Sequence, residues 1–169
     1  MLALPKKTDY ALIALHYLLE HPDRIAPARE IAEIYHLPCA LLMNVMKELQ
    51  QGGLVRSVRG AKGGYQLSVD PRQATLYDVV VLTGGGEPAL TECCQDAVLH
   101  APSGAEEIRC QVGSGCPVRQ PLRALHHRLV RFLKDVKLAD LLQPGYRIDV
   151  PLESVGVTSS SVTASSIRF

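Results

Sequence analysis

The chain carries a group of cysteines whose spacing suits metal chemistry. Its members are Cys93, Cys94, Cys110 and Cys116, and five residues separate the last two. Thiolates are soft ligands that suit zinc, copper(I) and iron–sulfur clusters. A spacing of five residues exceeds the roughly two to four residues of a usual zinc pair. Because the segment between the last two cysteines contains two glycines, it can wrap a larger inorganic core. The group therefore predicts an iron–sulfur cluster, and the alternative is a set of ordinary reduced thiols.

Other residues with chemical potential are less informative. Cys39 lies far from the other cysteines along the chain and is expected to be a packing residue. His126 and His127 fall between the apolar positions of a helical pattern, so both are expected to be solvated. The sequence contains no Gly-x-Ser-x-Gly elbow, P-loop or His-Glu-x-x-His motif. Because no base, nucleophile and orienting group can be named together, the chain is not expected to be an enzyme.

Composition narrows the class of protein. The 169 residues are enough for one core, or for one core with an appendage. The formal net charge is only +1, so affinity for nucleic acid must come from local placement of Lys and Arg. Aromatic residues make up 5% of the chain, which disfavours a protein that stacks single-stranded bases. The sequence shows no secretory signal and no segment long and apolar enough to span a membrane. It is therefore expected in the cytoplasm, where thiols stay reduced, with no membrane partner.

Helical periodicity predicts three helices in the first third of the chain, over residues 8–20, 27–35 and 38–50. Pro27 and Pro38 suit the starts of the second and third helices. The expected inward positions are Leu12, Leu15, Leu19, Ile31, Ile34, Leu42, Val45 and Leu49.

A β-hairpin is expected next. Two short alternating segments, 54–58 and 65–69, flank a glycine-rich turn. Two helices joined by a short turn and followed by a hairpin make a winged helix-turn-helix. Thr75 and Asp78 form a capping-box pattern for a fourth helix over 76–83. The predicted fold class is mainly α with a small β-hairpin wing.

In this fold the helix over 38–50 is the recognition helix, which lies in the major groove of DNA. Its expected outward residues are Ala40, Leu41, Met43, Asn44 and Lys47, an unusually apolar set. Asn44 can pair with adenine, and Lys47 can reach guanine or a phosphate. The expected contacts from the wing are Arg56, Arg59, Lys62, Gly63 and Gly64, the glycines through close approach of the backbone. The alternative is a winged helix that binds proteins.

A heptad pattern follows residue 117 and is typical of a helix that packs along another helix. Its positions are Val118, Leu122, Leu125, Leu129, Phe132 and Val136. We therefore divide the chain into a winged helix-turn-helix domain (1–83), a cysteine-containing, cluster-binding loop (84–116), a dimerisation helix (117–142) and a C-terminal extension (143–169). The end of the extension is rich in Ser and Thr and is expected to be disordered.

These motifs resemble the Rrf2 family of bacterial transcription regulators over about residues 1–142. The matching segments are 7–12 in the opening helix, 29–32 in the helix-turn-helix, 53–60 and 63–65 in the wing, and 138–142. The residues that resemble the cluster-binding members, which include IscR, NsrR and RirA, are Glu92, Cys93, Cys110, Cys116 and Pro117.

The resemblance implies a homodimer that binds double-stranded operator DNA and carries an iron–sulfur cluster, either 2Fe-2S or 4Fe-4S. It implies that Cys93, Cys110 and Cys116 are metal ligands, with Cys94 as the alternative to Cys93. It also implies that Asp9 supplies the last ligand across the dimer, as in the nitric-oxide-sensing branch. The segment between Cys93 and Cys110 is longer than these members usually have.

The expected function is that of a DNA-binding transcription regulator, a repressor, whose operator affinity is switched by a cluster that senses nitric oxide, redox state or iron status. Arg119 stands where the branch with a histidine ligand has that histidine, so such a ligand is not expected there. One alternative is a cluster-free regulator of the same fold that senses oxidants through its thiols. Another is a small iron–sulfur redox protein that does not bind DNA.

Overall fold

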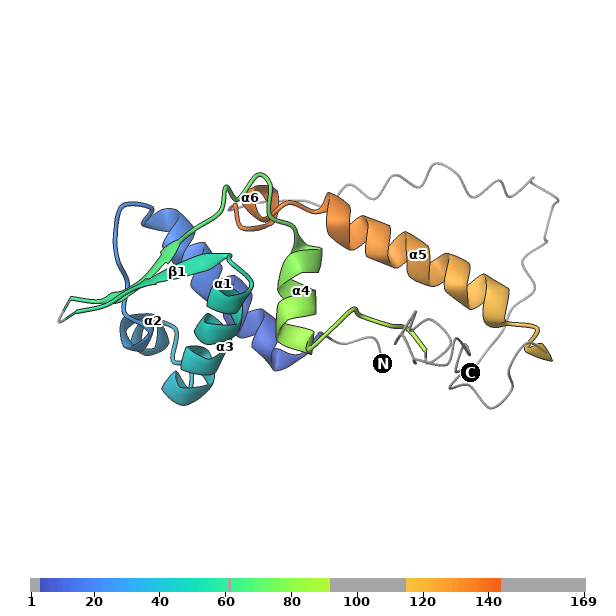
Figure 1. The fold of residues 1–169 in the computed structure, drawn as a ribbon, viewed down its shortest axis with the longest axis horizontal. Coiled ribbons are helices and arrows are strands. Elements are labelled where there is room, and N and C mark those ends of the chain that lie inside the picture. Colours follow the sequence, from blue (N-terminus) through green and yellow to red (C-terminus); the bar gives the residue numbers. More distant parts are fainter. Residues whose placement is uncertain (1–3, 61, 92–114, 144–169) are drawn as a thin grey trace, which may run out of the picture.

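The computed structural model describes residues 4–60, 62–91 and 115–143 (Figure 1). Its elements are α1 (Lys6–Glu20), α2 (Ala28–Ile34), α3 (Cys39–Gln51), β1 (Val55–Val58), β2 (Gly64–Leu67), α4 (Leu76–Gly84), α5 (Arg119–Asp135) and α6 (Leu138–Leu141). Helix α5 extends away from the group formed by the other elements (Figure 1). The predicted fold class, mainly α with a β-hairpin wing, is confirmed.

The main core lies where α1, α2 and α3 meet. Leu15 and Leu18 of α1 are buried against Ile31 of α2 and a row of α3 side chains. That row includes the predicted inward residues Leu42, Val45 and Leu49, all of them fully buried. The inward placement predicted for Ile34 is wrong, because its side chain is 51% exposed. Three residues turn a helix by about 300°, so Ile34 points to one side of the strip that Ile31 buries.

The hairpin pairs β1 with β2 in antiparallel register, with Arg56 opposite Gln66 and Val58 opposite Gly64. The chain before α2 adds a short third pairing, because Ala26 N donates to Tyr65 O at 2.9 Å and Tyr65 N donates to Ala26 O at 2.8 Å. The wing is therefore fixed to the start of the helix-turn-helix.

Helix α4 starts at the predicted capping box. Asp78 N donates to Thr75 Oγ1 at 3.3 Å, and Thr75 N donates to the Asp78 carboxylate at 2.8 Å. Gly85 follows in the left-handed conformation with φ of 76°, which ends the helix. A second cluster of buried residues joins α4 to the end of α5, and it consists of Leu76, Val80, Leu133 and Val136.

The chain after α5 returns to the main core. Leu138 of α6 is 1% exposed, its N donates to Ala74 O at 3.0 Å, and Ala139 N donates to Pro71 O at 2.9 Å. The end of the segment predicted as a dimerisation helix thus packs within the winged helix-turn-helix domain. Most of the predicted cysteine loop and of the C-terminal extension lies outside the described residues, so the proposed domain division stays a prediction. No helix in the described ranges is long and apolar enough to cross a membrane.

Candidate functional site

Helix α3 presents a strip of exposed residues opposite its buried face. Successive residues turn a helix by about 100°, which places Ala40, Asn44 and Lys47 on one line pointing away from the core. All three are exposed. Leu41 and Met43 are also exposed and flank this line on its two sides. The structure thus brings together on one side of α3 the five residues predicted to point outward from this helix.

A polar network fixes the first helix of the helix-turn-helix. The Tyr17 hydroxyl donates to the Glu30 carboxylate and accepts from Arg24 Nη1 at 3.2 Å, while Arg24 Nη2 lies 3.0 Å from Glu30. The hydrogen bond to Glu30, assisted by burial, raises the pKa of Tyr17 above its usual value. His36, with φ of 52°, forms the turn between α2 and α3.

A second group of contacts connects α3 to the opening turn of α1. Lys7 Nζ lies 2.6 Å from Glu48 Oε1, while the second carboxylate oxygen of Glu48 is buried without a hydrogen-bond partner among the described residues. Next to Lys7, the buried hydroxyls of Thr8 and Thr83 are 2.7 Å apart. The first turn of α1 therefore contacts both the recognition helix and the end of α4.

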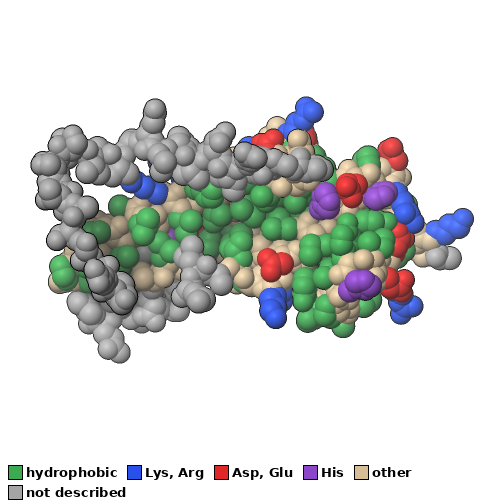
Figure 2. All heavy atoms as spheres, turned by 180° about the vertical axis from the view of Figure 1, so that it is seen from behind, with side chains coloured by type: hydrophobic (Ala, Val, Ile, Leu, Met, Phe, Trp, Pro, Cys, Tyr) green, Lys and Arg blue, Asp and Glu red, His purple; other side chains and the backbone are tan. Residues whose placement is uncertain are grey.

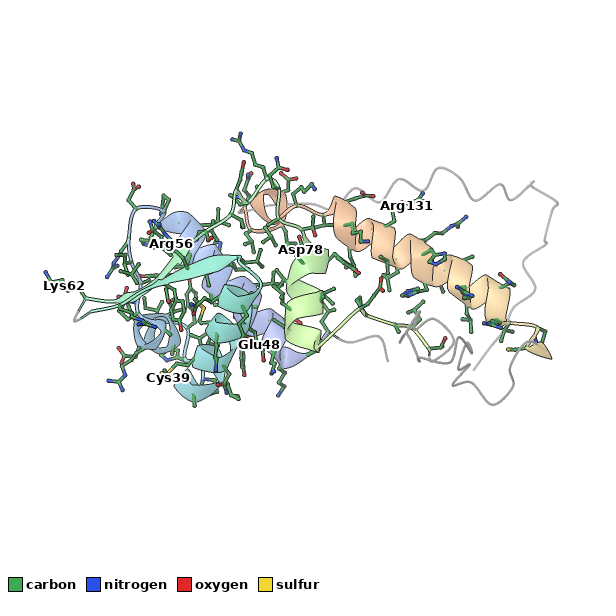
Figure 3. The ribbon with its side chains drawn as sticks, viewed as in Figure 1. Cys39, Glu48, Arg56, Lys62, Asp78 and Arg131 are labelled. Carbon is green, nitrogen blue, oxygen red and sulfur yellow. The ribbon has the colours of Figure 1, made fainter. Side chains whose placement is uncertain are left out.

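The wing carries its basic residues in two different settings. Arg56 Nη2 donates to Gln66 Oε1 at 2.8 Å, and Gln66 Nε2 donates to Pro22 O at 2.8 Å. Side chains alternate along a strand, so Arg56 and Ser57 point to opposite faces. Ser57 accepts a hydrogen bond from Gln50 of α3 at 3.0 Å. Arg56 therefore lies on the face of the hairpin that is turned away from the recognition helix (Figure 3).

The tip of the wing is the more exposed setting. Arg59 and Lys62 are exposed, and Lys62 extends outward from the tip (Figure 3). Gly63 and Gly64 are half-buried. A Cβ atom on Gly63 would come within 2.4 Å of Val58 O, and one on Gly64 within 2.5 Å of the Ala26 carbonyl. Both glycines are thus required by the packing of the hairpin itself.

One face of the molecule is unevenly charged (Figure 2). Figure 2 shows charged and histidine side chains gathered at the end of the molecule that carries the hairpin, and hydrophobic side chains across its middle. Lys and Arg side chains stand among Asp and Glu side chains there, so Figure 2 shows a mixed polar surface around the hairpin.

The candidate metal ligands are only partly within the described residues. Cys116 is half-buried just before α5, and Asp9 is exposed in the first turn of α1. Cys93, Cys94 and Cys110 lie outside the described residues. Figure 1 places the start of α5 well away from the start of α1, so one chain does not bring Cys116 and Asp9 together. Within the described ranges, no three His, Cys, Asp or Glu side chains are grouped for a metal ion.

Cys39 begins the recognition helix and is partly buried against the main core, which agrees with its predicted role in packing. Helix α5 differs more from the prediction. His127 is exposed as expected, but His126 is only 3% exposed, so the prediction that it is solvated is wrong. In this part of the structure, His126 Nδ1 and Arg119 Nε are buried without a hydrogen-bond partner.

The heptad pattern did not predict the burial of His126, because the pattern marks apolar positions only. The buried strip of α5, which consists of His126, Val130 and Leu133, lies beside the heptad strip. Gln66 and Glu30 were missed for another reason. Their roles depend on pairing with Arg56 and Tyr17, which are distant in sequence. The sequence offers one signal for Gln66. Once the strand register is known, the alternation of side chains places Gln66 opposite Arg56 on the same face of the hairpin.

Comparisons with known proteins agree with this architecture. The family described as Rrf2, iron-dependent transcriptional regulator, matches residues 4–144. The chain belongs to the Rrf2 family. A protein of Aquifex aeolicus (strain VF5) named as an HTH-type transcriptional regulator is 33% identical over 133 residues, which cover 79% of this chain and 86% of that protein.

Two solved structures show the same fold. CymR (YrzC), the global cysteine regulator of B. subtilis, has a TM-score of 0.60 at 24% identity, covering 84% of this chain and 97% of CymR. IscR of T. potens has a TM-score of 0.58 at 23% identity, covering 83% of this chain and 86% of IscR. As an Rrf2 protein, the chain is a transcription regulator with a DNA-binding fold, which is a non-enzymatic role.

Proposed function

We propose that this Rrf2 protein is a homodimeric repressor whose affinity for operator DNA is controlled by an iron–sulfur cluster. The observation that carries the DNA-binding part is the exposed line of Ala40, Asn44 and Lys47 on the second helix of the helix-turn-helix. Contact with operator DNA would take place in the cytoplasm, where thiols are kept reduced.

The proposed interface has two parts. The N-terminal half of α3 enters the major groove, where Asn44 pairs with adenine and Lys47 reaches guanine or a phosphate. Arg59 and Lys62 at the wing tip contact phosphates or the minor groove beside it. Arg56, on the opposite face of the hairpin, reaches only the flanking backbone. Gly63 lets the hairpin turn pack on itself, and Gly64 lets the hairpin lie close to the segment before α2. We propose that both glycines also let the backbone approach the duplex.

The proposed dimer interface is the heptad strip of α5. Val118 and Leu125 are 53% and 55% exposed and Leu122 is half-buried, whereas Leu129 and Phe132 of the strip already pack on the cluster between α4 and α5. Removing such side chains from water favours association. A second copy of α5 offers the matching heptad pattern.

The proposed cluster ligands are Cys116, Cys110, one of Cys93 and Cys94, and Asp9 of the other subunit. Thiolates fit such a cluster chemically. The structure adds that the half-buried thiol of Cys116 lies three residues before Arg119, whose buried Nε–H has no acceptor in the described ranges. A buried donor of this kind suits the anionic surroundings that thiolates create. When bound, an iron–sulfur cluster supplies one-electron redox chemistry.

Ligation of Asp9 would link the metal site to the recognition helix through one turn of α1. Lys7, two residues before Asp9, holds Glu48 of α3, and Thr8 holds Thr83 of α4. Loss of that ligation would remove one restraint on this turn, which would still be held by Lys7 and Thr8. Because a dimer must match half-sites about one helical turn of DNA apart, a small shift of α3 changes operator affinity.

The test is anaerobic purification followed by visible spectroscopy, iron and sulfide analysis, and a gel shift on operator DNA before and after removal of iron. We expect a coloured protein whose DNA affinity changes on iron removal. Replacing Cys93, Cys94, Cys110 and Cys116 together by Ala should abolish both colour and response. Asp9→Ala should shorten cluster lifetime while leaving some colour.

The same experiment separates the alternatives. A colourless, iron-free protein whose DNA affinity still responds to oxidants would indicate a thiol-based regulator of the same fold. A coloured protein that binds no duplex would indicate a redox protein instead. If the protein with all four cysteines replaced still responds to oxygen, nitric oxide and iron starvation like the wild type, the proposed switch is ruled out.

A further inference from the structure

The recognition helix exposes two large hydrophobic side chains for which its own fold gives no reason. Leu41 is 47% and Met43 is 54% exposed. Helix α3 already buries four residues, namely Leu42, Val45, Met46 and Leu49, so its hydrophobic face is complete without them. Of the large hydrophobic residues exposed in the described ranges, Val118 and Leu125 lie on the proposed dimer strip. Leu41 and Met43 lie instead on the proposed DNA interface.

Their positions on α3 are defined by neighbouring contacts. Met43 lies on the side of the helix that also carries Gln50, whose amide contacts Ser57 of the wing. Leu41 lies on the other side, the one that carries Glu48 and faces α1. Asn44 lies between them on the outward line. Leu41 and Met43 thus border the base pair that Asn44 would read.

We infer that Leu41 and Met43 read thymine methyl groups on the two sides of the base pair read by Asn44. This inference rests on the proposed binding of α3 in the major groove. There, the C5-methyl of thymine is the apolar group among the base edges, whereas guanine and cytosine present only acceptors and donors. A hydrocarbon or thioether side chain against a G·C pair desolvates those groups without replacing their hydrogen bonds.

The operator half-site is therefore A·T-rich at its centre, with an adenine opposite Asn44 and thymines facing Leu41 and Met43. The size of the effect follows from burial of one methyl group, which corresponds to about a fourfold change in affinity. A dimer reads each position twice, so removal of both symmetry-related methyl groups lowers affinity about fifteenfold.

The experiment begins by enriching bound sequences from a random duplex pool with the full-length protein. Thymines of the enriched site are then replaced pairwise by deoxyuridine, which removes only the methyl group. Binding is measured by fluorescence anisotropy at one salt concentration, because phosphate contacts depend strongly on salt. We expect two symmetric pairs of thymines at which deoxyuridine lowers affinity by about tenfold or more.

Variants assign each methyl group to a side chain. Leu41→Ala and Met43→Ala should each bind the thymine duplex more weakly and lose the discrimination against deoxyuridine at one pair. Both residues are exposed, so both variants should unfold at the wild-type temperature. Lys47→Ala is the matched control on the same helix. It should weaken binding to both duplexes equally and keep full discrimination.

The outcomes separate the inference from the function on which it rests. Enrichment of no duplex overturns the proposed DNA binding and the inference with it. An enriched site that tolerates deoxyuridine at every position, or discrimination that survives in both Leu41→Ala and Met43→Ala, overturns the inference and leaves DNA binding intact. An enriched site whose centre is rich in G·C pairs also overturns the inference and leaves DNA binding intact.

Discussion

At the scale of single residues, Gly64 shows how closely two backbone segments approach at the base of the wing. A Cβ atom there would lie 2.5 Å from both the carbonyl carbon and oxygen of Ala26, and 2.7 Å from Pro27 N. Backbone atoms cannot turn aside as a flexible side chain can. Gly64→Ala should therefore separate the hairpin from α2 and lower the free energy of unfolding by about 1–3 kcal/mol.

The matched control for Gly64→Ala is Gly84→Ala. Gly84 is the last residue of α4, and a Cβ atom on it would have nothing within 4 Å. Alanine there should leave stability unchanged or raise it by up to about 1 kcal/mol. Urea unfolding of both variants checks the prediction, and equal stabilities would contradict it.

Tyr17 makes a second prediction at this scale. Its pKa is raised by the hydrogen bond to Glu30 and by burial. A raised pKa in the folded state means that this contribution to stability is complete below about pH 10, the ordinary tyrosine pKa, and is lost as the pH rises through the folded value. Tyr17→Phe should lower the free energy of unfolding by about 1 kcal/mol at neutral pH. As the pH rises above about 10 it should then lose less stability than the wild type. If the free energies of unfolding of Tyr17→Phe and the wild type change in parallel with pH, Tyr17 does not contribute to stability in this way.

At the scale of elements, the contact between α1 and α4 depends on two hydroxyl groups. Thr83 Oγ1 donates its single hydrogen to Val79 O at 2.8 Å, so the Thr8 hydroxyl is the donor in the Thr8–Thr83 pair. Thr8→Val keeps the shape of the side chain but leaves Thr83 without this buried donor. The free energy of unfolding should fall by about 1 kcal/mol.

The control for this prediction is Thr8→Ser, which retains the hydroxyl and should keep the hydrogen bond. If Thr8→Val also changes operator affinity at a temperature where it is fully folded, the opening turn of α1 supports α3 as proposed. An operator affinity equal to that of Thr8→Ser would argue against that coupling.

The elements also show what local sequence determines. Proline before α2 and α3, and the capping box of α4, placed those helix starts within a residue or two of the observed ones. The outward line of Asn44 and Lys47 followed from the helical period alone. The face on which Arg56 lies did not, because it requires the register with β2 and the contact of Ser57 with α3. The exposure of Ile34 likewise depends on how α3 crosses α2.

At the scale of the whole molecule, the C-terminal end of α5 packs on α4, whereas Val118 just before its start and Leu125 in its N-terminal half are exposed. Leu133 and Val136 pack against α4, and α6 returns the chain to the main core. The heptad pattern correctly indicated a long amphipathic helix, but periodicity cannot say which strip a neighbour covers. His126 and Val130 are buried, while Leu125 stays exposed. Only the first half of the heptad strip, with Val118, Leu122 and Leu125, is thus available for a second copy, because Leu129, Phe132 and Val136 pack at the α4 contact.

The last prediction tests that use of α5. Leu125→Glu places a charge in the proposed interface, and an unpaired charge buried between helices is strongly unfavourable. The protein should become monomeric in sedimentation equilibrium, and its affinity for a two-half-site operator should approach that for one half-site. Ala124→Glu is the control, because Ala124 is exposed and lies outside the heptad strip. Ala124→Glu adds the same charge one residue away but outside the strip, so it should leave the dimer intact. Dissociation of both variants would point to charge rather than the strip, and a dimeric Leu125→Glu would place the interface elsewhere.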